Sequence, residues 1–146
     1  MPKIDKKITD FKVVNSDKEP NLPVYNLERG ESLTGATYKI KPTGIDHAVY
    51  ITINDITLPD GSIKPFEIFI NSKHQESHQW CAITTRLISA IWRNGGDCHF
   101  VIEEMKVIHD PKGGYFAKKL GFVPSMVAHI GAIIEQHLEC LNNVPI

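Results

Sequence analysis

The spacing of apolar residues predicts an antiparallel sheet in the first half of the chain. Residues 37–41 alternate in the manner of an edge strand that stops at Pro42. Residues 47–56 are rich in β-branched and aromatic residues, with apolar positions at every second place. Residues 58–62, Leu-Pro-Asp-Gly-Ser, carry turn chemistry. The strand predicted over 63–71 should therefore return antiparallel to its predecessor.

After Ser72 the apolar period changes from that of a strand to that of a helix. A first helix should end at Asn94-Gly95-Gly96, whose residues can adopt the left-handed conformation. Residues 98–106 are expected to form a short helix, with a strand over 98–102 as the alternative. A loop is expected over 111–114, followed by a last helix that starts at Ser125 or Pro124. The two long helices carry apolar stripes, which are Trp80, Ile83, Thr84, Leu87, Ile88 and Ile91, and then Met126, Val127, Ile130, Ile134, Leu138 and Leu141.

Strands that precede helices along the chain indicate an α+β fold, a small antiparallel sheet of about three strands covered by two main helices. A parallel doubly wound sheet is disfavoured, because the segments between the predicted strands are too short for crossover helices. We expect an extended N-terminal arm over residues 1–35, a single domain over 36–142 and a C-terminal tail over 143–146.

Composition narrows the class of protein. A chain of 146 residues with 42% apolar and 23% charged residues suits one globular domain. Its formal net charge of -1 disfavours a nucleic-acid-binding module. The charged N-terminus has no apolar signal segment, and no apolar run approaches the roughly 20 residues that span a bilayer, so we expect no membrane association. Three cysteines without a close pair suit a reducing compartment, which favours the cytoplasm.

Few residues fit a known catalytic pattern. His74 and His78 have the spacing that can hold a transition metal on one helix face, but the intervening residues do not match the metalloprotease pattern. A solvent-exposed helix entrance is the favoured interpretation, with a metal site as the alternative. A reactive thiol needs a base or cation that lowers its pKa, and the sequence alone identifies no such partner for Cys81 or Cys98, so we expect buried, inert thiols.

Six ordered blocks over about 100 residues resemble the TSCPD family, which is known from the C-terminal accessory domain of adenosylcobalamin-dependent (class II) ribonucleotide reductases. The blocks are residues 37–40 (TYKI), 47–55 (HAVYITIND), 65–73 (PFEIFINSK), 85–90 (TRLISA), 95–97 (GGD) and 110–114 (DPKGG). The family's Thr-Ser-Cys-Pro-Asp string does not occur, and its cysteine-rich tail is not found after Cys140. The large reductase barrel is also missing.

The resemblance implies a stand-alone, non-catalytic accessory or regulatory domain in deoxynucleotide synthesis. Its partner would be a separately encoded ribonucleotide reductase catalytic chain, to which adenosylcobalamin would belong, and a nucleotide is a second candidate ligand. We expect this chain alone to bind no cofactor and to catalyse no ribonucleotide reduction. The candidate contact residues, each of which could instead be a structural hydrogen-bond partner, are Asn54, Asp55, Glu67, Asn71, Lys73, Arg86, Asp97, Glu103 and Glu104.

Two enzymatic alternatives stay open. The chain could be a split subunit of an adenosylcobalamin-dependent ribonucleoside-diphosphate reductase that contributes a thiol from Cys81, Cys98 or Cys140. It could also be a small metal-dependent enzyme that uses His74 and His78. A homodimer is favoured over a monomer, because an exposed edge strand or an apolar last helix can be buried in a second copy.

Overall fold

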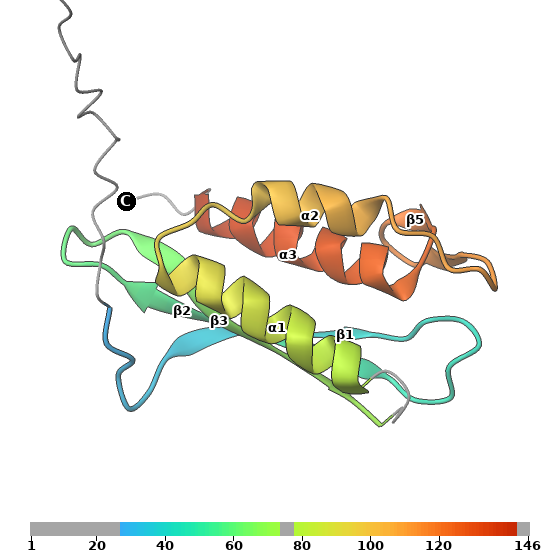
Figure 1. Cartoon of the computed structure of the whole chain (residues 1–146), viewed down its shortest axis with the longest axis horizontal. Helices are drawn as coiled ribbons and strands as arrows, with labels where there is room; N and C mark the ends of the chain where they lie inside the picture. The colour runs from blue at the N-terminus through green and yellow to red at the C-terminus, as the bar shows by residue number, and fades with distance from the viewer. Residues whose placement is uncertain (1–26, 74–77, 143–146) are drawn as a thin grey trace, which may run out of the picture.

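The computed structural model describes residues 27–73 and 78–142 (Figure 1). Strands β1 (Thr34–Ile40), β2 (Val49–Thr57) and β3 (Ile63–Ser72) form one antiparallel sheet in the order β1-β2-β3. The three strands and the edge position of β1 confirm the prediction. At the turn between β2 and β3, Gly61 has a φ of 85°, and Asp60 accepts hydrogen bonds from the Ser62 backbone and hydroxyl.

Three helices lie on one side of this sheet, which gives the α+β fold that the element order predicts (Figure 1). Helix α1 (His78–Arg93) packs along β3, α3 (Met126–Asn142) contacts β2 and β3, and α2 (His99–Lys106) packs against α3. No described helix is both long and apolar enough to cross a membrane. The core is formed by Val49, Ile51, Ile53, Ile68, Ile88, Trp92, Ile102, Met105, Ile130 and Ile134.

The ends of the helices follow the predicted local chemistry. After α1, Gly95 has a φ of 73°, and the amides of Gly95 and Gly96 donate to the carbonyls of Trp92 and Ile91. These two bonds satisfy carbonyl groups that the end of a helix leaves free. At the start of α3, the Ser125 hydroxyl oxygen accepts a hydrogen bond from the Ala128 amide over 3.0 Å. Ser125 is thus the N-cap residue.

The predicted stripe of α1 is partly wrong. Ile83 and Leu87 are each 59% exposed, whereas the helix buries Cys81, Thr85 and Ser89. These three small residues lie four apart and let α1 approach β3 closely, and the Ser89 hydroxyl accepts a hydrogen bond from the Ile68 amide. The larger side chains of α1 that reach the core do so from beside this row of small residues: they are Trp80, Ile88, Ile91 and Trp92.

A short hairpin was not predicted. Strands β4 (Tyr115–Ala117) and β5 (Gly121–Val123) pair antiparallel between α2 and α3, in a stretch that the sequence pattern presents as a loop and helix entrance. Each strand has only three residues, which is too few for an alternating apolar pattern to be recognised in the sequence.

Candidate functional site

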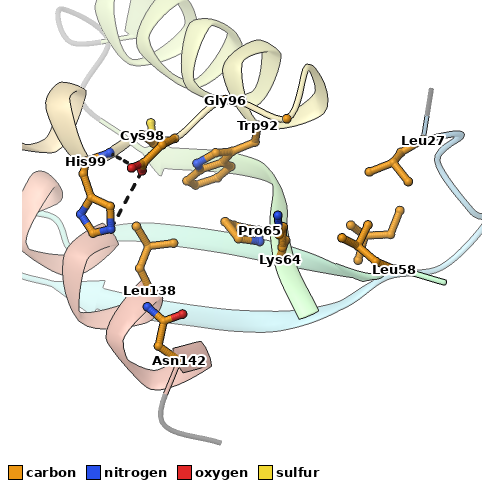
Figure 2. A pocket seen from close by; sticks show the side chains of 13 residues that line it. Leu27, Leu58, Lys64, Pro65, Trp92, Gly96, Cys98, His99, Leu138 and Asn142 are labelled. Atoms are coloured by element: carbon orange, nitrogen blue, oxygen red, sulfur yellow. Dashed lines mark hydrogen bonds and ion pairs between the residues drawn. The ribbon is translucent and has the colours of Figure 1, made fainter. Parts of the chain in front are cut away.

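A cavity of about 330 Å³ lies where four parts of the fold meet (Figure 2). The β2–β3 turn forms one side, the end of α1 and the start of α2 form a second, and the last turns of α3 form a third. The volume is at the small end of the range for ligand pockets. The lining residues are Leu27, Ile56, Leu58, Lys64, Pro65, Trp92, Gly95, Gly96, Asp97, Cys98, His99, Leu138 and Asn142.

The wall of the cavity is mainly apolar. Figure 2 shows the Trp92 ring in the middle of the wall, with Pro65 and Lys64 on the β3 side and Leu138 on the α3 side. Trp92 and Leu58 are almost fully buried, so both are held by packing. A mainly apolar wall favours a compact ligand with an apolar face.

The polar groups of the cavity are gathered at its rim. Asp97 precedes α2, and its carboxylate accepts a hydrogen bond from the His99 amide over 3.0 Å and lies 3.9 Å from the His99 imidazole. The carboxylate therefore complements the positive end of the helix dipole. Lys64 and Asn142 add an ammonium and an amide group. The rim can thus both donate and accept hydrogen bonds at the edge of a bound molecule.

The cavity contains a thiol that is poorly suited to nucleophilic chemistry. Cys98 is 2% exposed, and burial together with the negative charge of Asp97 raises its pKa to about 11. The thiol is therefore protonated near neutral pH, and the thiolate is the reactive form of cysteine. The arrangement is suited to binding.

Glu67 on β3 is the centre of a second polar cluster, in which Arg93 of α1 lies 3.8 Å from its carboxylate. It is 2% exposed and receives hydrogen bonds from Arg29 Nε at 3.0 Å, Arg29 Nη2 at 2.9 Å and Asn54 Nδ2 at 2.9 Å. The Arg29 hydrogen bonds lower the pKa of Glu67. The cluster fastens the segment before β1 to the sheet, which indicates a structural role.

A third cluster links the sheet to α3. The His137 imidazole lies 2.9 Å from Asp55 through Nε2 and 2.8 Å from the Tyr38 hydroxyl through Nδ1. Asp55 and His137 are both buried. Two turns earlier on α3, His129 Nδ1 lies 2.8 Å from the Tyr115 hydroxyl. Sequence analysis missed both histidines, although a polar residue on the apolar face of a helix signals a buried partner.

The structure distributes the predicted contact residues over several places. Asn54 and Glu67 meet in one cluster, Asp55 points to His137 of α3, and Asp97 lines the cavity. Asn71 and Lys73 line a shallow depression at the far end of β3, together with His47, Ala48, Tyr50 and Ser72. Arg86, Glu103 and Glu104 are exposed on α1 and α2. These residues therefore do not form a single site.

The structure describes the three cysteines and one of the two histidines of the enzymatic alternatives. Cys81 and Cys98 are buried, as predicted, and Cys140 is exposed. Burial raises the pKa of Cys81 to about 11. His78 is exposed at the start of α1, whereas His74 lies outside the described residues. Among the described residues, no group of three or more His, Cys, Asp or Glu side chains is placed to hold a metal ion.

Comparison with known proteins gives one assignment. A model of the TSCPD domain family matches residues 23–138, which are most of the chain. This range includes all of the described strands and the whole of two helices. Searches of curated proteins and of solved structures found no match. The matched region contains the sheet, α1, α2, the β4–β5 hairpin and most of α3, and the chain therefore belongs to the TSCPD domain family.

Proposed function

We propose that this chain is a non-catalytic accessory domain that binds the catalytic chain of an adenosylcobalamin-dependent (class II) ribonucleotide reductase and so takes part in deoxynucleotide synthesis. The observation that carries the proposal is the TSCPD family match over residues 23–138, because the family is known from the accessory domain of these reductases. A likeness of fold does not by itself assign an activity, so the chemistry of the described residues has to be consistent with a binding role.

The side chains of the described part support binding over catalysis. Two of the three thiols are buried with their pKa raised to about 11. The most buried carboxylate, Glu67, is already bonded to Arg29 and Asn54. The cavity of about 330 Å³ does not fit a corrin macrocycle, so adenosylcobalamin would be held by the catalytic chain.

The cavity supports a nucleotide as a second ligand. A nucleobase is a flat ring that can pack on the apolar wall beside Trp92, with its amino edge toward the Asp97 carboxylate. Lys64 offers a positive charge for a phosphate group. The domain would then report nucleotide levels to the reductase.

Association is tested by mixing purified protein with a class II reductase catalytic chain from the same source and measuring complex formation by light scattering and calorimetry. We expect a stoichiometric complex. A catalytic chain that stays free at micromolar concentrations of both proteins would contradict the proposal.

Nucleotide binding is tested separately by thermal shift and tryptophan fluorescence with ribo- and deoxyribonucleoside triphosphates. Leu138→Trp should fill the cavity and abolish the response, whereas Leu87→Trp, on the exposed face of α1, should leave it unchanged. No response from the parent protein, or an equal response from Leu138→Trp, would contradict this assignment of the cavity.

One observation favours the split-subunit alternative. Cys140 on α3 is exposed, so its thiol could exchange with a thiol of the catalytic chain. Cys140→Ser in a reconstituted reductase mixture discriminates the two roles. Unchanged ribonucleotide reduction supports an accessory domain, and complete loss with normal complex formation supports a redox subunit.

A further inference from the structure

The β4–β5 hairpin presents an unusually exposed pair of aromatic rings. Phe116 and Phe122 are cross-strand partners whose ring centroids lie 5.7 Å apart in an edge-to-face arrangement. They are nevertheless 79% and 59% exposed. Two large rings that contact each other and water form a compact apolar knob, which costs free energy in solution unless a partner covers it.

Further exposed apolar residues lie in the hairpin turn and in the segment that is bonded to the base of the hairpin. Leu120, in the hairpin turn, is 40% exposed, and Val107 and Ile108, just after α2, are 64% and 45% exposed. The segment after α2 is fastened beside the hairpin, because the Asp110 amide donates to the Pro124 carbonyl and the Ser125 hydroxyl donates to the Ile108 carbonyl. A cluster of exposed apolar residues on one part of a protein marks an interaction site.

The knob is held rigidly from behind. Tyr115 and Val123 point inward from the same two strands, where the Tyr115 hydroxyl bonds to the buried His129 of α3 and Val123 is 5% exposed. Gly114 packs tightly before β4, since a Cβ there would lie 2.9 Å from Pro124 Cα. A preorganised surface loses little conformational entropy on binding.

The charges around the knob are mainly positive. Lys112, Lys118 and Lys119 are exposed, and Asp110 is the single acidic residue between positions 107 and 123. The Asp110 carboxylate already accepts a hydrogen bond from the Lys112 amide. This end of the protein is therefore locally basic in a chain whose formal net charge is -1.

We propose that the β4–β5 hairpin is the docking surface for the partner protein, and that the partner offers an apolar pocket for Phe116 and Phe122 rimmed by carboxylates that meet Lys118 and Lys119. The inference rests on the proposed function, since the partner is the reductase catalytic chain. Nucleic acid fits less well, because the two rings are packed on each other and the net charge of the chain offers no general attraction for phosphates.

The apolar contact is tested with the double variant Phe116→Ser/Phe122→Ser. We expect its affinity for the purified reductase catalytic chain to fall by at least about 30-fold, as for aromatic residues at the centre of an interface. The matched control is Ile83→Ser/Leu87→Ser, which removes two apolar side chains with exposed fractions of 59% each from α1. The control should bind as the parent does.

The charge complementarity is tested with Lys118→Glu/Lys119→Glu. We expect slower association, an affinity loss of at least about tenfold and a weaker dependence on salt. Lys39→Glu/Lys41→Glu, which reverses two exposed lysines at the end of β1, is the control and should leave the affinity within about twofold of the parent. Circular dichroism checks that each variant is folded. If the phenylalanine variant does not fold, the lysine variants alone test the docking surface.

The results separate the two proposals. If the parent binds the catalytic chain and the hairpin variants bind equally well, the docking surface is wrong and the accessory role stands. Equal losses in the hairpin and α1 variants would also overturn the docking surface. If the parent does not bind, the accessory role fails, and the docking inference fails with it.

Discussion

The hydroxyl of Tyr38 on β1 lies 2.8 Å from Nδ1 of His137 on α3, across 99 positions of sequence. Burial is the main cause that raises the pKa of Tyr38, so the phenol keeps its proton near neutral pH. Because the Asp55 carboxylate accepts from Nε2 over 2.9 Å, Nδ1 of the neutral imidazole is the acceptor for the Tyr38 hydroxyl. One imidazole thus joins the edge strand and the central strand to the last helix.

Removing the Tyr38 hydroxyl should weaken this connection. We expect Tyr38→Phe to lower the free energy of unfolding by about 1 kcal/mol, because His137 Nδ1 loses its donor in a buried position. Urea denaturation followed by circular dichroism measures the change. Tyr50→Phe, on an exposed ring of β2, is the control and should be neutral. Equal stabilities of the two variants would show that the bond contributes nothing.

Glu67 should make the free energy of unfolding depend on pH in the acidic range. Glu67→Gln is expected to cost about 2 kcal/mol near neutral pH, because the hydrogen bonds from Arg29 and Asn54 lose a charged acceptor. The folded-state pKa of Glu67 lies below its ordinary value of 4.5, so the stabilisation is present above that pH and is lost as the pH falls through the folded-state pKa. Unfolding measured over this range should show the parent and the variant converging in acid. A constant gap between them would contradict this origin.

Gly35 should not tolerate a side chain. It pairs with Asn54 across β1 and β2, and a Cβ at this position would collide with the Ile53 carbonyl and lie 2.7 Å from Asn54 Cα. We expect Gly35→Ala to cost about 1–3 kcal/mol through displaced backbone. Gly30→Ala is the matched control, since its Cβ would lie 3.5 Å from the Ser32 carbonyl oxygen, an ordinary van der Waals distance. Thermal unfolding of both variants decides the point.

The three thiols should react at very different rates. A pKa of about 11 for Cys81 and Cys98, against the ordinary 9.0, leaves a thiolate fraction about 100-fold smaller near neutral pH, and burial slows access further. Native protein treated with a thiol reagent should show one fast site by mass spectrometry. Cys140→Ser should remove it, because Cys140 is exposed. Fast labelling of a second cysteine would show that the core opens readily.

The amino-acid sequence by itself determined the elements whose signals are local. Alternating apolar residues identified β2 and β3, and Asp60 and Gly61 supply the turn chemistry between them. Gly95 and Ser125 mark helix ends because each satisfies backbone groups within a few residues of itself. The TSCPD resemblance was also visible from short blocks in the chain, and the family match bears it out.

Only the tertiary structure decided which groups from distant elements meet. The buried face of α1 depends on how closely the helix approaches β3, so small Cys81, Thr85 and Ser89 face inward in place of Ile83 and Leu87. The Glu67 carboxylate on β3 is paired because Arg29, which precedes β1 in the sequence, reaches it. The cavity and the Tyr38–His137 pair likewise arise from contacts between segments far apart in sequence. Spacing along the chain specifies an element and its periodicity, whereas burial and pairing depend on the positions of the other elements.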